Sequence, residues 1–174
     1  IAIIILTILA FGKRERVVIV PPLVNDRYEI AYDSANKNYH ENWGLYVAQF
    51  MGNINPGNAS FIEEGLQKQF SPKLYEEVRS EIMDQAERMR QTGKSLRFYP
   101  DSIVFEKQSG KTFVTGKQEI ESSTGAVTEK EVVYEMKIEI QNGIPQVIAY
   151  DYYEGAPRTQ DYLAKHSATV GANR

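Results

Sequence analysis

Apolar residues recur at spacings of three and four from about Asp33 to Met51, and this spacing keeps side chains on one face of an α-helix. Gly52 then serves as a helix stop, and the composition of the next residues, Asn53 to Gly57, is typical of a loop. The pattern therefore predicts a first helix with an aromatic inner face. That face comprises Tyr32, Ala35, Tyr39, Trp43, Tyr46, Val47 and Phe50.

Two more helices are predicted before Gly93. Ser60 and Glu63 have the spacing of a capping box, in which the serine caps a helix and the glutamate reaches back to it. Ser71-Pro72 is typical of a helix beginning, and the third helix ends near Gly93. The inner stripes are Ile62, Leu66 and Phe70, followed by Leu74, Val78, Ile82, Ala86 and Met89. Mixed charges predict a solvated outer face on the third helix, made of Glu76, Glu77, Arg79, Glu81, Asp84, Glu87, Arg88 and Arg90.

After Gly93 the pattern changes to alternation, which is the period of a half-buried strand. Turn residues at Ser109-Gly110, Thr124-Gly125 and Asn142-Gly143 separate the strands as consecutive hairpins. Pro100-Asp101 predicts a bend or bulge in the first strand. The predicted strands are Leu96 to Lys107, Thr112 to Glu121, Thr128 to Gln141 and Ile144 to Tyr153.

These elements bury their apolar faces only by packing on one another. We therefore predict an α+β domain over residues 33–154, with three N-terminal helices on the concave face of a curved, four-stranded antiparallel meander. Residues 155–174 are expected to form a flexible C-terminal tail.

The first twelve residues carry no charge, and Thr7 is their one polar side chain. As a helix they would cover roughly 18 Å, whereas a bilayer core of roughly 30 Å needs about 20 residues. We interpret residues 1–12 as the C-terminal part of a transmembrane helix; the alternatives are the end of a signal peptide and a buried core helix. The anchoring side chains would be Ile1, Ile3, Ile4, Ile5, Leu6, Ile8, Leu9 and Phe11.

Residues 13–32 are interpreted as a juxtamembrane stalk, because a short β-branched stretch there stops at Pro21-Pro22. Lys13, Arg14 and Arg16 follow the apolar segment directly, and such charge is typical of the cytoplasmic side of a membrane helix. Because that rule compares both flanks of a helix, the charges alone leave the topology open.

Composition removes several classes of function. The 174 residues include no cysteine, which excludes disulfides, thiolate metal sites and thiol nucleophiles. Twenty basic residues against 23 acidic ones give a net charge of −3, so no basic excess attracts a phosphate backbone. We expect no direct sequence-specific binding of nucleic acid.

Candidate chemistry is sparse. His40 and His166 lie far apart, with no cysteine or acid pair at metal-ligand spacing, and no glycine-rich phosphate loop is present. We therefore expect no metal and no cofactor. Tyr150, Tyr152 and Tyr153 flank Asp151 at the end of the last strand. Three interpretations stay open: core tyrosines, an aromatic patch that meets a partner, or a catalytic aspartate with tyrosine donors.

The ordered layout resembles the TraE family of inner-membrane subunits from F-like conjugative type IV secretion machines. The likeness covers nearly the whole chain, and dispersed stretches carry it: Tyr39 to Phe50 with Gly44 and Ala48, Asn55-Pro56, Phe70-Ser71-Pro72, Phe98-Tyr99-Pro100 and Asn142-Gly143. The resemblance implies a single-pass protein of the bacterial inner membrane whose folded domain lies in the periplasm. It also implies the cystatin-like fold shared with nuclear transport factor two.

The role implied by this resemblance is structural. The chain would be a scaffold for plasmid transfer by conjugation, linking inner-membrane and periplasmic parts of the channel, binding other secretion subunits and self-associating. No catalytic residue comes with the family, so no enzyme is predicted. The rival is a periplasmic small-molecule binding protein or an enzyme, since the same fold encloses a conical pocket in which Asp151 or His40 could act.

Overall fold

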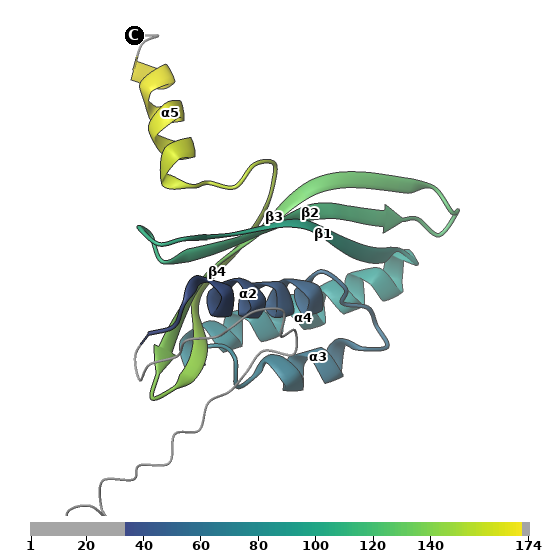
Figure 1. The fold of residues 1–174 in the computed structure, drawn as a ribbon. Coiled ribbons are helices and arrows are strands. Elements are labelled where there is room, and N and C mark those ends of the chain that lie inside the picture. The colour runs from purple at the N-terminus through teal and green to yellow at the C-terminus, as the bar shows by residue number, and fades with distance from the viewer. Residues whose placement is uncertain (1–33, 172–174) are drawn as a thin grey trace, which may run out of the picture.

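A computed structural model describes residues 34–171 of the chain (Figure 1). The predicted membrane segment at residues 1–12 and the predicted stalk at residues 13–32 lie outside the described residues. Within residues 34–171, no helix combines the length and the apolar character needed to cross a membrane.

Three helices precede the sheet, as the sequence predicts: α2 (Lys37–Met51), α3 (Ala59–Leu66) and α4 (Pro72–Thr92). The Asn36 side chain caps α2 by accepting a hydrogen bond from the Tyr39 amide at 3.2 Å. Pro72 occupies the first turn of α4, and Gly93 ends that helix with a φ of 64°. The prediction that Ser60 caps the second helix is wrong, because α3 begins one residue earlier.

The four strands form one antiparallel sheet in the order β1-β2-β3-β4, so the predicted meander is confirmed. Their bounds are β1 (Ser95–Glu106), β2 (Lys111–Glu121), β3 (Val127–Gln141) and β4 (Ile144–Glu154). Asn142 and Gly143 both have positive φ, at 55° and 79°, which fits the tight turn predicted between β3 and β4.

Two irregularities bend the sheet. The first lies between Pro100 and Ser102, which confirms the predicted bulge. Gly116 makes it possible, because a Cβ there would lie 2.2 Å from the Tyr99 carbonyl oxygen. The second, at Ile148 of β4, was not predicted. Beside it, the Val147 amide donates to the Gln69 carbonyl at 2.7 Å, so the chain before α4 covers part of this sheet edge.

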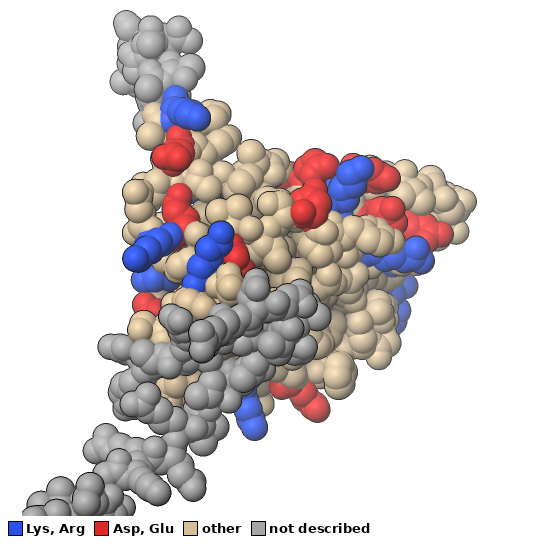
Figure 2. All heavy atoms as spheres, viewed as in Figure 1, with Lys and Arg blue, Asp and Glu red and all other residues tan. Residues whose placement is uncertain are grey.

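All three helices lie on one side of the sheet, and we call the face on that side the concave face; α2 and α4 contact the strands, and α3 packs on these two helices (Figure 1). The main core fills this interface, with side chains such as Ile82 of α4 and Val114 of β2 fully buried. The opposite, convex face carries a small buried cluster made of Phe113, Val133 and Tyr153. Acidic and basic groups intermingle at both ends of the sheet on the face drawn in Figure 2, so neither charge sign forms a continuous surface there.

A helix that the sequence analysis did not predict follows the sheet. It is α5 (Gln160–Gly171), and it projects from the convex side, away from the other helices (Figure 1). Thr159 supplies a local start signal, since its hydroxyl accepts a hydrogen bond from the Tyr162 amide at 3.2 Å. The flexibility expected of residues 155–174 stays a prediction.

Candidate interaction site

A groove of about 440 Å³ lies between α4 and the concave face of the sheet. Its volume falls within the usual range of roughly 300–1,000 Å³ for ligand pockets. Apolar and aromatic side chains dominate the walls, and polar groups lie among them. The groove is lined by Met51, Glu81, Gln85, Arg88, Met89, Thr92, Lys94, Ser95, Leu96, Gln118, Ile120, Tyr134, Tyr150 and Tyr152.

Two tyrosines and a glutamine form a connected polar cluster in this groove, and the ring of a third tyrosine, Tyr150, lies beside it. The Tyr152 hydroxyl donates to Gln118 Oε1 at 2.5 Å, and Gln118 Nε2 donates to the Tyr134 hydroxyl at 3.3 Å. The Tyr134 ring centroid lies 5.1 Å from that of Tyr152 and 6.4 Å from that of Tyr150. Burial raises the pKa of all three phenols, so they stay protonated and act as neutral hydrogen-bonding groups.

Glu81 is the acidic group of the groove. The sequence places it on the solvated face of the third helix, but the structure half-buries it at the groove. Burial raises the pKa of its carboxyl group, an effect that the positive charge of Arg88 opposes. Glu81 makes no hydrogen bond or ion pair with another residue of the described chain, whereas Arg88 and Lys94 are exposed.

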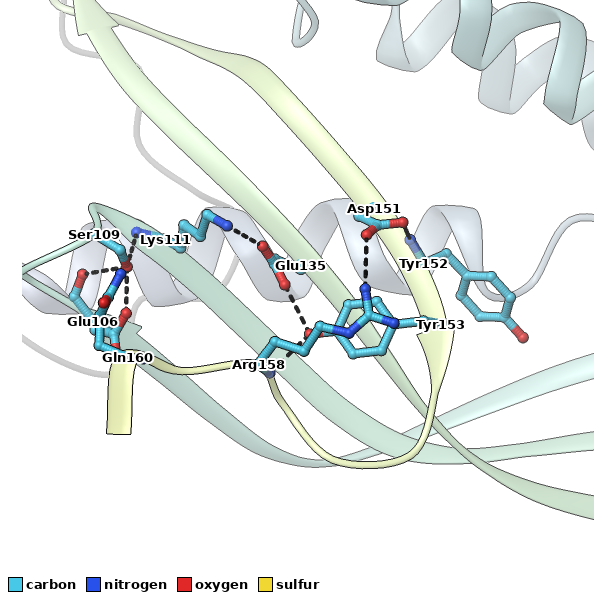
Figure 3. Close-up of polar contacts among 9 residues, drawn as sticks. All are labelled: Glu106, Ser109, Lys111, Glu135, Asp151, Tyr152, Tyr153, Arg158 and Gln160. Carbon is cyan, nitrogen blue, oxygen red and sulfur yellow. Dashed lines mark hydrogen bonds and ion pairs between the residues drawn. The ribbon is translucent and has the colours of Figure 1, made fainter. Parts of the chain in front are cut away.

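The convex face carries a second polar cluster, centred on Tyr153 (Figure 3). The Tyr153 hydroxyl donates to Glu135 Oε2 at 2.7 Å and accepts from the Arg158 amide at 3.0 Å. Lys111 pairs with the other oxygen of Glu135, whose residue is only 8% exposed. Burial, together with the Glu135 carboxylate, raises the pKa of Tyr153, so this phenol also stays protonated. Neighbouring strands and the chain after β4 are thereby joined at one point.

The same cluster fixes the beginning of α5. The Arg158 guanidinium lies 3.9 Å from the Tyr153 ring centroid and 3.6 Å from Asp151 Oδ2. The Gln160 amide donates to Glu106 Oε1 at 2.8 Å, which brings a carboxylate to the N-terminus of α5 (Figure 3). We call residues Glu106, Lys111, Glu135, Asp151, Tyr153, Arg158 and Gln160 the convex clamp.

The structure divides the three tyrosines of the predicted interaction patch between the two faces. Tyr150 and Tyr152 line the concave groove, whereas Tyr153 is 9% exposed and belongs to the convex clamp. This division follows the alternation of side chains along a strand. Their role in binding a partner stays a prediction.

The residues weighed for an enzyme lie apart. His40 is 8% exposed and stacks on Phe105 at a ring distance of 4.3 Å, and it does not line the groove. Asp151 borders a smaller hollow of about 290 Å³ and pairs with Arg158. His166 stacks on Tyr162 in α5. Within residues 34–171, no three His, Asp or Glu side chains gather as a metal site would require.

Sequence reasoning missed Gln118, Glu135 and Arg158. Gln118 occupies an inward position of the second strand, and a polar residue at such a position is the available signal, because it needs a buried partner. Glu135 and Arg158 gave no comparable signal, because the contacts of Glu135 depend on strand register and Arg158 lies in the segment expected to be a flexible tail.

Comparison with known proteins identifies the relatives of this chain. Residues 1–149 match the family described as TraE protein. The match ends before Asp151, so the last five residues of β4 and all of α5 lie beyond it. No curated protein matches the chain.

Solved structures with a similar fold include a TraE protein in complex with 2-chloroisonicotinic acid, at a TM-score of 0.59 and 10% identity, covering 70% of this chain and 98% of that one. The VirB8 protein of Agrobacterium tumefaciens gives a TM-score of 0.52 at 11% identity, covering 68% and 92%. A TrwG component of a type IV secretion system from Bartonella birtlesii gives 0.51 at 12%, with the same coverage. At these identities, the similarity establishes the fold.

Proposed function

Because this chain belongs to the TraE family, we propose that it is a structural subunit of a bacterial conjugative type IV secretion apparatus. In this role it links the inner-membrane part of the DNA-transfer channel to the periplasmic part and has no catalytic step of its own. The match to the TraE family over residues 1–149 carries the proposal. The fold supports it, since proteins named for type IV secretion share it.

The surface chemistry favours assembly over catalysis. Each face of the sheet brings tyrosine together with arginine, Arg88 at the groove and Arg158 in the convex clamp, and both residue types are enriched in protein interfaces. Asp151 and His40, which were weighed as catalytic groups, do not line the groove, and its one acid, Glu81, has no histidine or second acid beside it among the lining residues. Contacts with other subunits therefore account for these faces better than a reaction does.

We further propose a single membrane pass with the domain in the periplasm. The support is the apolar sequence of residues 1–12 together with the topology that the family resemblance implies. Carbonate-washed membranes should retain the full chain, and protease should digest the domain only after the outer membrane is opened. A chain found entirely in the carbonate wash would overturn the anchor, and digestion only after inner-membrane lysis would reverse the orientation.

Gene deletion in a donor strain tests the role itself. We expect plasmid transfer to fall to the background of the mating assay and to return when the full chain is supplied in trans. Plasmid replication and donor growth serve as controls and should not change. Normal transfer from the deletion strain would exclude an essential role in the channel.

Binding of a small aromatic acid in the groove is a second candidate function. The observation that favours it is a groove of about 440 Å³ lined with tyrosines, with Arg88 and Lys94 among its lining residues. A TraE protein of the same fold has been solved with 2-chloroisonicotinic acid. Nuclear magnetic resonance titration with that acid should shift the signals of Tyr134 and Tyr152. Unchanged tyrosine signals at millimolar ligand would exclude this function.

A further inference from the structure

The fold alone does not account for the stability of the C-terminal helix α5. It projects from the convex side (Figure 1), and Leu163 remains 46% exposed on it. An isolated helix shorter than about 12–15 residues is marginal in water, because nucleation is costly and packing supplies most helical stability in proteins. Helix α5 has 12 residues and an exposed Leu163, so it gains stability from a surface that covers this side chain.

The convex clamp sets the direction in which α5 points, because it fixes the start of the helix at several points. The Arg158 amide, its guanidinium and the Gln160 amide are each held by a different group of the sheet: Tyr153, Asp151 and Glu106, respectively. These bonds hold the first turn (Figure 3), and the following turns project from the convex side (Figure 1). Such an arrangement presents the helix to another molecule.

The groove offers a surface of matching chemistry on the other side of the sheet. Leu96, Ile120 and the tyrosines can cover an apolar helix face, in the manner of helix-in-groove recognition. Glu81 brings a half-buried carboxyl group that makes no hydrogen bond or ion pair among residues 34–171, and Arg88 and Lys94 bring exposed positive charge. The first turns of α5 carry both signs as well, at Asp161 and Lys165.

We propose that α5 of one copy of this chain docks in the concave groove of a second copy. The helix leaves the convex side whereas the groove opens on the concave side, so α5 meets the groove of a neighbour rather than its own. The contact is therefore head-to-tail. Repeated around an axis it closes a ring, in which every copy gives one helix and receives one.

The contact is small, which explains why α5 binds the groove of a second copy firmly only within an assembly. One short helix on one groove buries less than the roughly 1,200 Å² typical of stable interfaces. A single contact is therefore weak in dilute solution. Copies held together at a membrane bind each other at a high effective concentration, and closure of a ring adds the contacts together. The inference goes beyond the proposed function, because it applies to any oligomer that this chain forms.

Disulfide crosslinking of full-length chains in cell membranes tests the proposal. The sequence contains no cysteine, so two introduced thiols give a clean background. One tagged copy carries Leu163→Cys, and a second copy with a different tag carries Thr92→Cys at the exposed edge of the groove. We expect a disulfide-linked species that bears both tags. Leu96→Cys, within the groove, is a second acceptor in case the first variant folds poorly.

Val127→Cys is the matched control, because this residue is 56% exposed at the start of β3 and does not line the groove. We expect at least tenfold less of the two-tag species with this variant. Three outcomes would overturn the proposal: equal linkage at Val127, linkage of Leu163→Cys only to another Leu163→Cys, or no two-tag species with either groove variant. Plasmid transfer by the same strains, assayed under reducing conditions, reports separately on the proposed function.

Discussion

The two faces of the sheet are stabilised in different ways. On the concave face, three helices bury a large apolar core, and fully buried side chains such as Ile82 and Val114 come from distant parts of the chain. On the convex face, a cluster of only three side chains lies under a network of charges and hydrogen bonds. The concave core therefore carries the stability of the domain, whereas the convex face mainly orients α5.

This difference separates stability from assembly. An apolar core resists local change, because its contacts are many and non-directional. A polar clamp depends on a few directional bonds, each of which contributes about 0.5–1.5 kcal/mol. Substitutions on the concave face should thus unfold the whole domain, whereas substitutions in the convex clamp should release α5 and leave the domain folded.

The largest effect is expected in the concave core. Ile82→Ala removes a fully buried side chain from α4 and should lower the free energy of unfolding by about 4 kcal/mol. Its convex counterpart, Val133→Ala, removes fewer atoms from a smaller cluster and should cost about 2 kcal/mol. Urea unfolding followed by circular dichroism measures both. An equal or larger loss for Val133→Ala would contradict the division of labour between the faces.

The bulge between Pro100 and Ser102 in β1 should be nearly as sensitive. Gly116→Ala places a Cβ 2.2 Å from the Tyr99 carbonyl oxygen, so β1 must shift. We expect a loss of about 3 kcal/mol by analogy with other overpacked sites. Gly65→Ala is the matched control, since nothing lies within 4 Å of its added Cβ and alanine favours the helix by about 0.5–1 kcal/mol. The midpoint temperature of thermal unfolding should fall for Gly116→Ala and rise for Gly65→Ala.

A smaller and local effect is expected at the convex clamp. Tyr153→Phe removes the hydroxyl that joins Glu135 to the Arg158 amide, at a cost of about 1–2 kcal/mol. Amide hydrogen exchange should become faster in α5 and stay unchanged in α4. Tyr162 lies within α5 but outside the clamp, so Tyr162→Phe should leave amide hydrogen exchange unchanged in both helices. Faster exchange throughout α4 after Tyr153→Phe would show that the clamp supports the core.

The smallest effect concerns acid stability. Burial lowers the pKa of His40 below its ordinary value of 6.5, so the folded protein binds fewer protons than the unfolded chain between the two values. Stability is therefore fully present above about pH 6.5 and falls as the pH drops toward the lowered pKa. His40→Phe preserves stacking on Phe105 and should flatten this dependence. An unchanged slope of unfolding free energy against pH would assign the effect to other groups.

The sequence predicts the concave side better than the convex side. Helical and alternating periods give the three helices and four strands with ends that differ by a few residues, because those periods reflect burial in the main core. Pro100 marks the first bulge through its missing amide, whereas nothing at Ile148 marks the second.

The convex clamp escaped prediction for a physical reason. An alternating pattern fixes the face of each strand residue, but a register shift of two residues keeps that face and changes every cross-strand partner. Helix α5 was overlooked because Gly155 and Pro157 indicate a loop and the small residues that follow carry little apolar period. Glu81 was misplaced because periodicity locates a residue on a helix face without showing how far the neighbouring sheet extends beside it.

Release of the domain from the membrane tests the central claim most directly. In a donor strain that lacks the native gene, residues 1–12 are replaced by a cleavable export signal, so that the folded domain reaches the periplasm without an anchor. An assembly subunit needs its position at the membrane, whereas an enzyme or a soluble binding protein works when free. We expect the released domain to accumulate folded while plasmid transfer stays at background. Transfer restored to the level of the anchored chain would contradict the account.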